Sequence, residues 1–222
     1  MRMRKKKNLD SRLEAVSEYL TDCEYKDLNF KNAKENRDLL DLKGVYGNDN
    51  PLVLEIGCGK GTFACTYAAQ HPELNLLAVE MEANVLVSAC EKAKAAGLKN
   101  VHFMRCNAQY LPAYLDDNSV EAIFLNFSCP YPKSTYENHR LTSKAFLDIY
   151  KELMTENAVV CQKTDNQKFF EYSIESLSQN GFKLSNISLD LHSSDFEGNI
   201  VTEYEQKFVD EGKPIFRLEA RL

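Results

Sequence analysis

The chain has 222 residues, of which 44% are apolar and 27% are charged, with 27 basic and 33 acidic side chains. This composition is typical of a globular enzyme or binding domain and excludes general disorder. Apolar stretches such as Leu52–Ile56 are far too short to cross a bilayer, and the charges of Met1–Lys7 lack the apolar segment of a secretory signal, so we expect a cytoplasmic protein without membrane contact.

The first fifty residues differ from the rest of the chain. Met1–Lys7 carries five basic residues and no acid, which leaves 22 basic against 33 acidic residues elsewhere. A short basic arm is enough to add phosphate contacts to a nucleic acid held mainly at another site, although a solvated tail has the same composition. We expect residues 1–50 to form this arm and a lead-in with a short amphipathic helix over Leu9, Leu13, Val16 and Leu20, and residues 51–222 to form one domain.

The body alternates short apolar segments with amphipathic ones, which predicts an α/β fold with a seven-stranded, doubly wound parallel sheet and helices on both faces. The expected strands are Leu52–Ile56, Leu76–Glu80, Val101–Arg105, Val120–Phe127, Ala158–Lys163, Phe182–Leu189 and Ile215–Ala220. The expected helices are Gly61–Gln70, Ala83–Ala96, Thr142–Leu153 behind a Thr cap, and Gln167–Gln179.

A glycine-rich turn, Gly57-Cys58-Gly59-Lys60-Gly61, separates the first strand from the first helix. Such a turn lies at the carboxyl edge of the sheet, where doubly wound folds bind ligands. A phosphate loop is excluded because Lys60 is followed by Gly61, and a dinucleotide loop matches poorly because Thr62 stands where its last glycine belongs.

Acidic residues border this turn. Glu55 precedes Gly57 by two residues, and Glu80 ends the second strand. Carboxylates there suit a cationic ligand such as S-adenosylmethionine (SAM), which has an ammonium and a sulfonium, and a terminal acid can accept from both ribose hydroxyls. The alternative is that both acids are solvated strand ends. Asn107, after the third strand, is the candidate to bind the adenine, or else a turn residue.

Further candidates follow the later strands. Cys129-Pro130-Tyr131-Pro132-Lys133 forms a rigid loop after the fourth strand. Asp165 follows the fifth strand and is either a substrate acceptor or a helix N-cap, and Thr202-Glu203-Tyr204-Glu205 also has the spacing of a capping box.

The seven cysteines are scattered, without a C-x-x-C pair, so neither a disulfide framework nor a metal site is indicated. We expect all but Cys129 to be small core residues.

These motifs occur in one order along nearly the whole chain, and together they resemble the bacterial tRNA (guanine-N7-)-methyltransferase family. The segments that carry the resemblance are Glu55-Ile56-Gly57-x-Gly59-Lys60-Gly61, Leu125-Asn126-Phe127-Ser128-x-Pro130-x-Pro132-Lys133, Arg140-Leu141-Thr142, Lys163-Thr164-Asp165-Asn166, Asp190-Leu191-His192, Glu197-Gly198-Asn199 and Thr202-Glu203-Tyr204-Glu205.

The resemblance implies a class I SAM-dependent methyltransferase with a Rossmann-like sheet, which makes 7-methylguanosine in the variable loop of tRNA. The residues that it implies for SAM are Glu55, Gly57, Gly59, Glu80, Asn107 and Cys129. It implies substrate binding by Lys133, Asp165, Thr202, Glu203, Tyr204 and Glu205, and RNA contacts by Thr135, His139 and Arg140. Whether the enzyme is a monomer or a homodimer stays open.

The chain departs from the family at one key position. Where the family has Asp-Pro-Trp-Pro-Lys, this sequence has a thiol, Cys129, at the position assigned to catalysis. Three hypotheses follow: an active tRNA methyltransferase, a tRNA-binding paralogue with impaired catalysis, and a class I methyltransferase acting on another substrate.

Overall fold

The computed structural model describes residues 6–23, 33–35 and 37–222, which form two compact units, Met1–Tyr114 and Leu115–Leu222. Most of the basic arm, Met1–Lys5, lies outside the described residues. The next residue, Lys6, is held on a helix, because its Nζ donates to Ser88 Oγ (2.6 Å) and its backbone N to Asn84 Oδ1 (2.8 Å).

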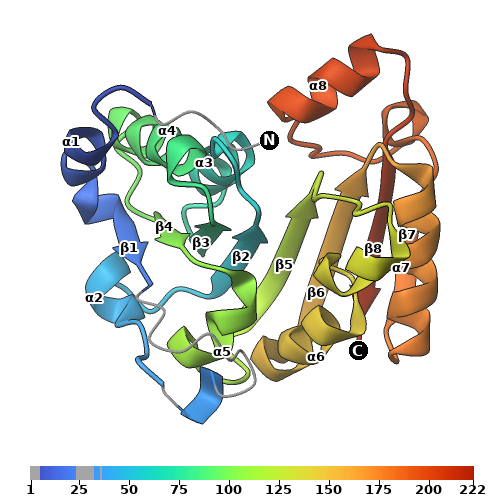
Figure 1. Ribbon diagram of the computed structural model, residues 1–222, viewed down its shortest axis with the longest axis horizontal. Helices are drawn as coiled ribbons and strands as arrows, with labels where there is room; N and C mark the ends of the chain where they lie inside the picture. Colours follow the sequence, from blue (N-terminus) through green and yellow to red (C-terminus); the bar gives the residue numbers. More distant parts are fainter. Residues whose placement is uncertain (1–5, 24–32, 36) are drawn as a thin grey trace. The chain divides into compact units, whose positions relative to one another are not determined.

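Within its described residues, the first unit contains four parallel strands in the order β1-β4-β3-β2 (Figure 1). Their bounds are β1 Leu20–Asp22, β2 Leu52–Ile56, β3 Asn75–Glu80 and β4 Val101–Arg105. Its helices are α1 Leu9–Glu14, α2 Leu42–Tyr46, α3 Thr62–Gln70, α4 Ala83–Ala95 and α5 Leu111–Tyr114. Short 3-10 turns lie at Ser17–Tyr19 and Ala108–Tyr110.

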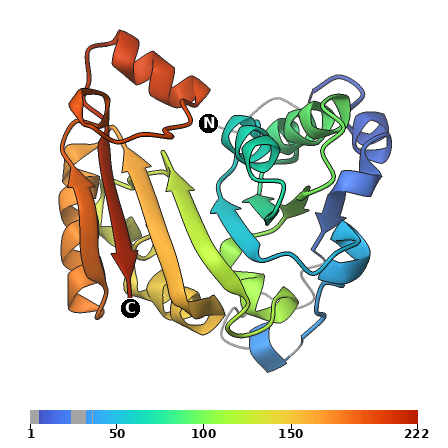
Figure 2. The same ribbon diagram turned by 180° about the vertical axis from the view of Figure 1, so that it is seen from behind.

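In the second unit the strand order is β5-β6-β8-β7, and Figure 2 shows these strands side by side from behind. Their bounds are β5 Val120–Asn126, β6 Met154–Thr164, β7 Lys183–Ser188 and β8 Phe216–Arg221. The helices are α6 Lys144–Leu153, α7 Gln167–Gln179 and α8 Glu203–Asp210, with 3-10 turns η4 Ser134–His139 and η5 Leu191–Ser193.

The α/β prediction is confirmed, with three local corrections. All seven expected strands are present, but β8 runs antiparallel to β6 and β7. The connection after β7 does not cross to the other end of the sheet, so β8 starts where β7 ends and runs in the opposite direction. The expected lead-in helix ends at Glu14, and Leu20 begins the extra strand β1 instead. Helix α6 begins at Lys144 with Ser143 as its N-cap, not at Thr142, whose hydroxyl bonds Ser173 Oγ (2.8 Å).

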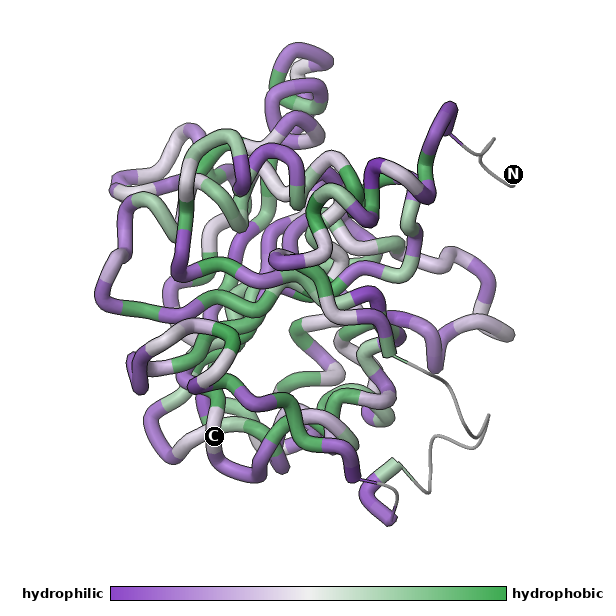
Figure 3. Tube along the Cα trace, turned by 90° about the vertical axis from the view of Figure 1, so that its left-hand side faces the viewer, coloured by the Kyte–Doolittle hydropathy of each residue, from purple (hydrophilic) through white to green (hydrophobic). Residues whose placement is uncertain are grey.

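The core follows the sequence pattern. Strands β2 and β3 are buried along almost their whole length, as strands covered on both faces are. In Figure 3 the trace alternates between hydrophobic stretches, in green, and hydrophilic stretches, in purple. Of the seven cysteines, Cys23, Cys58, Cys65, Cys90 and Cys106 are buried, Cys161 is half-buried and Cys129 is exposed. No helix within the described ranges is long and apolar enough to span a bilayer.

The buried His102 makes the stability of the protein depend on pH. Burial lowers its pKa from 6.5 to about 4, while Nε2 lies 2.9 Å from Thr21 Oγ1. In the unfolded chain His102 takes up a proton below about pH 6.5, whereas in the folded chain it does so only near pH 4. The stability that comes from keeping His102 neutral is therefore fully present above pH 6.5 and is lost as the pH falls to 4. It amounts to at most about 3 kcal/mol.

We therefore expect the His102→Gln variant to lose less stability than the unmodified protein between pH 6.5 and 4 in urea unfolding. The exposed His139→Gln variant is the control and should keep the original pH dependence. Parallel pH profiles for His102→Gln and the unmodified protein would contradict the assignment.

Candidate functional site

The glycine turn presents bare backbone at the carboxyl ends of the first unit's strands. Gly57 and Gly59 have φ angles of 82° and 55°, and a Cβ on either would meet nothing within 4 Å, so the space beside them is open. Gly61 has a different function, because a Cβ there would lie 2.6 Å from the Cβ of Ala89 on α4. Its lack of a side chain therefore lets α3 and α4 approach closely.

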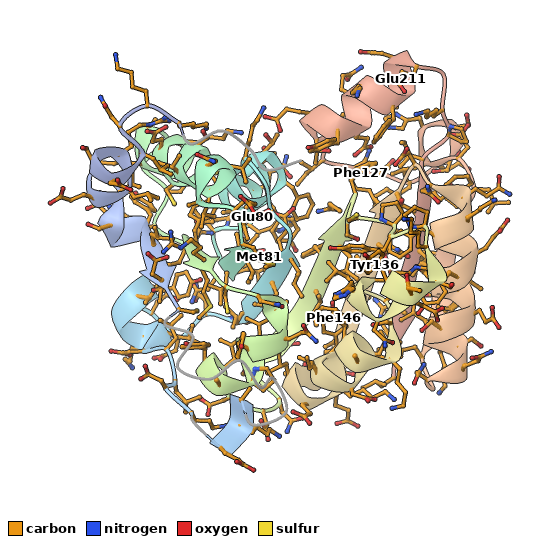
Figure 4. The ribbon with its side chains drawn as sticks, in the orientation of Figure 1. Glu80, Met81, Phe127, Tyr136, Phe146 and Glu211 are labelled. Carbon is orange, nitrogen blue, oxygen red and sulfur yellow. The ribbon has the colours of Figure 1, made fainter. Side chains whose placement is uncertain are left out.

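Glu80 joins the end of β3 to this turn. Its Oε1 accepts from the backbone N–H groups of Met81 (2.7 Å) and Glu82 (3.0 Å), and its Oε2 accepts from Gly59 N–H (3.2 Å). Glu80 and the exposed Met81 mark the end of β3 in Figure 4. The carboxylate is thus fixed beside the glycine turn by three backbone donors.

A second carboxylate, Glu55, is buried in β2 close to the same turn. Burial, together with the negative charges of Glu55 and Glu80, raises the pKa of Cys58 well above its usual value. The inside of the turn is therefore a negative environment, unlike a pocket for pyrophosphate.

Asn107 lies beside Glu80, because the backbone N–H of Cys106 donates to Glu80 O (3.2 Å). The Asn107 Oδ1 atom accepts from Gln109 N–H (3.0 Å), so the turn function considered from the sequence is present. Glu55, Gly57, Gly59, Glu80 and Asn107 all lie at one edge of the first unit's parallel strands. Carboxylates next to open glycine backbone suit a cationic ligand with hydroxyl groups, and the residues fit SAM.

The second unit carries two of the other predicted residues, Cys129 and Lys133, on the loop that follows β5. Phe127 and Tyr131 have left-handed φ angles of 52° and 39°, although neither is glycine. The backbone N–H of Phe127, at the end of β5 in Figure 4, donates to Lys163 O (2.8 Å). Between them Cys129 is exposed, and so is Lys133 beyond them.

The three residues predicted to contact RNA are placed differently from one another. Thr135 and His139 are exposed on η4, and the His139 ring lies 5.5 Å from that of Tyr131 and 5.9 Å from that of Tyr136. The half-buried guanidinium of Arg140 points back to the loop, where Nε donates to Pro130 O (3.1 Å).

Asp165 follows β6 and is half-buried, with Lys213 Nζ at 4.0 Å from its carboxylate. It does not cap the following helix. That function belongs to Asn166, whose Oδ1 accepts from Phe169 N–H (2.9 Å). The N-cap interpretation of Asp165 is therefore wrong, and its assignment as a substrate acceptor stays a prediction.

The segment Thr202–Glu205 starts α8 with the predicted cap, because Thr202 Oγ1 accepts from Glu205 N–H (3.1 Å). Glu203 and Tyr204 are exposed. The Glu205 side chain is 0% exposed and binds inside the unit, where Lys163 Nζ donates to its Oε2 at 2.7 Å.

The network around Glu205 was not predicted. Its Oε1 lies 2.6 Å from Asn199 Nδ2 and 2.9 Å from His192 Nε2, and Lys163 Nζ also donates to Asn199 Oδ1 and Ile200 O, both at 2.9 Å. Lys163, His192 and Asn199 all belong to segments that carry the family resemblance. That shared membership was the signal in the sequence, but it did not say which residues pair.

Comparison with known proteins shows which family the chain belongs to. The model of a family described as putative methyltransferase matches residues 49–218. A Streptococcus pneumoniae protein named tRNA (guanine-N(7)-)-methyltransferase is 43% identical over 220 residues, which cover 99% of each chain. The chain belongs to the tRNA (guanine-N(7)-)-methyltransferase family. A second family member, from Streptococcus thermophilus, is 46% identical over 177 residues, covering 80% of this chain and 83% of its own.

Solved structures agree on the fold of this family member. An antibiotic-related methyltransferase superposes with a TM-score of 0.62 at 19% identity, covering 84% of this chain and 96% of its own. A SAM-dependent methyltransferase from Aquifex aeolicus has a TM-score of 0.54 at 16% identity, covering 87% and 98%. The fold is the Rossmann-like class I methyltransferase fold.

Proposed function

We propose that this protein transfers a methyl group from SAM to N7 of a guanosine in the variable loop of tRNA. The observation that carries the proposal is the carboxylate of Glu80, fixed by three backbone donors beside an open glycine turn in a chain that matches this family over its full length.

On the donor side, Glu80 would accept from the ribose hydroxyls of SAM through its two oxygens, and Asn107 would contact the adenine. Gly57 and Gly59 leave room for the ligand to approach the backbone, and the charge of Glu55 favours its cationic groups. When bound, SAM supplies a methyl group activated by the sulfonium.

On the acceptor side, N7 of guanine has a lone pair and carries no proton, so transfer to it needs no general base. The residues of the second unit therefore have to position the guanine and exclude water. The residues that we assign to the guanosine are Lys133, Asp165, Thr202, Glu203, Tyr204 and Glu205. Carboxylates among them would accept from the guanine N1–H and amino group and offset the positive charge that develops on the base.

Glu205 is buried and bound to Lys163, so we place it beneath the exposed residues of this group, where its contacts fix the start of α8. Glu203, Tyr204 and the exposed Lys133, Thr135 and His139 then face the RNA. We assign to Cys129 the catalytic position that the family resemblance gives it.

The proposal is tested by mapping 7-methylguanosine in tRNA from cells in which this gene is deleted. Loss of the modification from the variable loop, and its return when the gene is supplied on a plasmid, is the expected result. An unchanged modification pattern would show that the protein is a tRNA-binding paralogue or acts on another substrate.

Cys129→Asp tests whether the thiol limits the rate. It restores the carboxylate that the family has at this position, and groups that stabilise developing charge contribute about two to three orders of magnitude in other enzymes. We expect methylation of tRNA to rise severalfold, with Cys129→Ala close to the unmodified protein. If Cys129→Asp abolishes transfer while SAM still binds, the assignment of this position is wrong.

A further inference from the structure

The loop that carries Cys129 is bent at two strained positions. Phe127 and Tyr131 both have left-handed backbone angles, which non-glycine residues adopt only where surrounding contacts hold them. The loop is therefore expected to keep this shape only through specific anchors. One anchor is the hydrogen bond from Phe127 N–H to Lys163 O at its start.

Arg140 supplies the anchor at the other end. Its Nε donates to Pro130 O (3.1 Å) and Tyr131 O (3.3 Å), and its Nη2 donates to Tyr131 O (3.1 Å). The planar guanidinium matches this pair of carbonyls as a fork, which an ammonium group cannot do. Arg140 thus holds the strained residue Tyr131 and its neighbour directly.

Tyr172 on α7 fixes the guanidinium from one face, with Arg140 Cζ 4.2 Å from the centre of its ring. The Tyr172 ring is half-buried, and burial followed by the charge of Glu137 raises the pKa of its hydroxyl. Because α7 starts directly after β6, Tyr172 ties the loop to a rigid element of the same unit.

We propose that Arg140 is a positioning residue that, stacked on Tyr172, locks the Cys129 loop in its reactive shape, and that it is not a phosphate contact. The rate measurements that test this inference rest on the proposed function, whereas the positioning of the loop by Arg140 does not. Misplacing a reacting group by about 1 Å costs on the order of 100-fold in rate, so loosening this loop should act on the transfer step.

The test compares Arg140→Met, which removes both the fork and the charge, with Arg140→Lys, which keeps the charge. We expect both to lower the single-turnover rate of tRNA methylation, on the order of 10- to 100-fold for Arg140→Met. The Kd for tRNA and the slope of its salt dependence should stay unchanged. Tyr172→Leu should reproduce the rate loss, and Tyr172→Phe, which keeps the ring, should not.

Lys144→Met is the matched control, because it removes an exposed charge four residues away that pairs only with Asp148 among the described contacts. Amide hydrogen exchange over Phe127–Lys133 gives a readout independent of activity, and it should become faster in Arg140→Met and Tyr172→Leu. A protein that methylates no tRNA would refute the proposed function while the exchange data still test the lock.

Two results would overturn the proposal that Arg140 holds the Cys129 loop in place. One is unchanged amide exchange of the loop in Arg140→Met. The other is a salt slope smaller by about one in Arg140→Met with an unchanged transfer rate, which is the behaviour of a phosphate contact.

Discussion

Replacing Glu80 by Gln is expected to weaken SAM binding by at least about tenfold. The substitution preserves size but exchanges one acceptor oxygen for a donor, so the side chain could no longer accept from Gly59 N–H and, as we propose, from two ribose hydroxyls together. Loss of a charged hydrogen bond of this kind costs about 1.5–3 kcal/mol, which corresponds to tenfold or more in affinity. Isothermal titration with SAM measures it.

Glu82→Gln is the control for this experiment. Glu82 is exposed two residues further along, and the contact described for it to Glu80 is made by its backbone, so the same chemical change there should leave SAM affinity intact. Equal SAM affinities of Glu80→Gln and Glu82→Gln would show that Glu80 does not bind SAM. Melting temperatures of both variants show whether the turn itself has kept its structure.

Breaking the buried pair of Lys163 and Glu205 is expected to produce the largest loss of stability. Lys163 is 7% and Glu205 0% exposed, and their charged atoms lie 2.7 Å apart. Lys163→Met would leave the carboxylate of Glu205 buried without its cation, and removing one partner of such a pair costs about 3–5 kcal/mol. Urea unfolding at pH 7 measures the free energy of unfolding.

The double variant Lys163→Met with Glu205→Leu separates the charge effect from lost packing. When both charges are replaced by apolar groups of similar size, stability is often retained, so the double variant should recover most of the loss. A Lys163→Met protein within about 1 kcal/mol of the unmodified one would show that the pair does not hold α8. A double variant as unstable as the single one would assign the loss to packing and to Asn199 and His192.

That Glu55, Glu80 and the glycine turn lie at one edge of the strands could be predicted because their signals are local in sequence. The glycine turn, Glu55 and Glu80 each lie at the end of a strand recognisable from its apolar run, and parallel strands bring such ends to one edge. The antiparallel direction of β8 was missed because an apolar run gives the position of a strand and not its direction.

The acceptor side could be predicted only in part, because its contacts join distant segments. Lys163 and Glu205 are 42 residues apart, and Arg140 contacts the ring of Tyr172, which lies on α7. The residue type alone does not tell whether a charged side chain contacts RNA or binds within the protein. From the sequence, Arg140 is therefore assigned to RNA and Glu205 to the guanosine. The side-chain geometry adds what the sequence does not show, namely that Arg140 binds the carbonyls of its own loop and that Glu205 pairs with Lys163.

Transfer of a labelled methyl group by the purified protein tests the central claim most directly. The protein is incubated with methyl-labelled SAM and an unmodified tRNA transcript, and the product is cleaved chemically at 7-methylguanosine. We predict label at one guanosine of the variable loop, and none when that guanosine is replaced by adenosine. Label on another nucleotide, or no transfer by a protein that binds both SAM and tRNA, would contradict it.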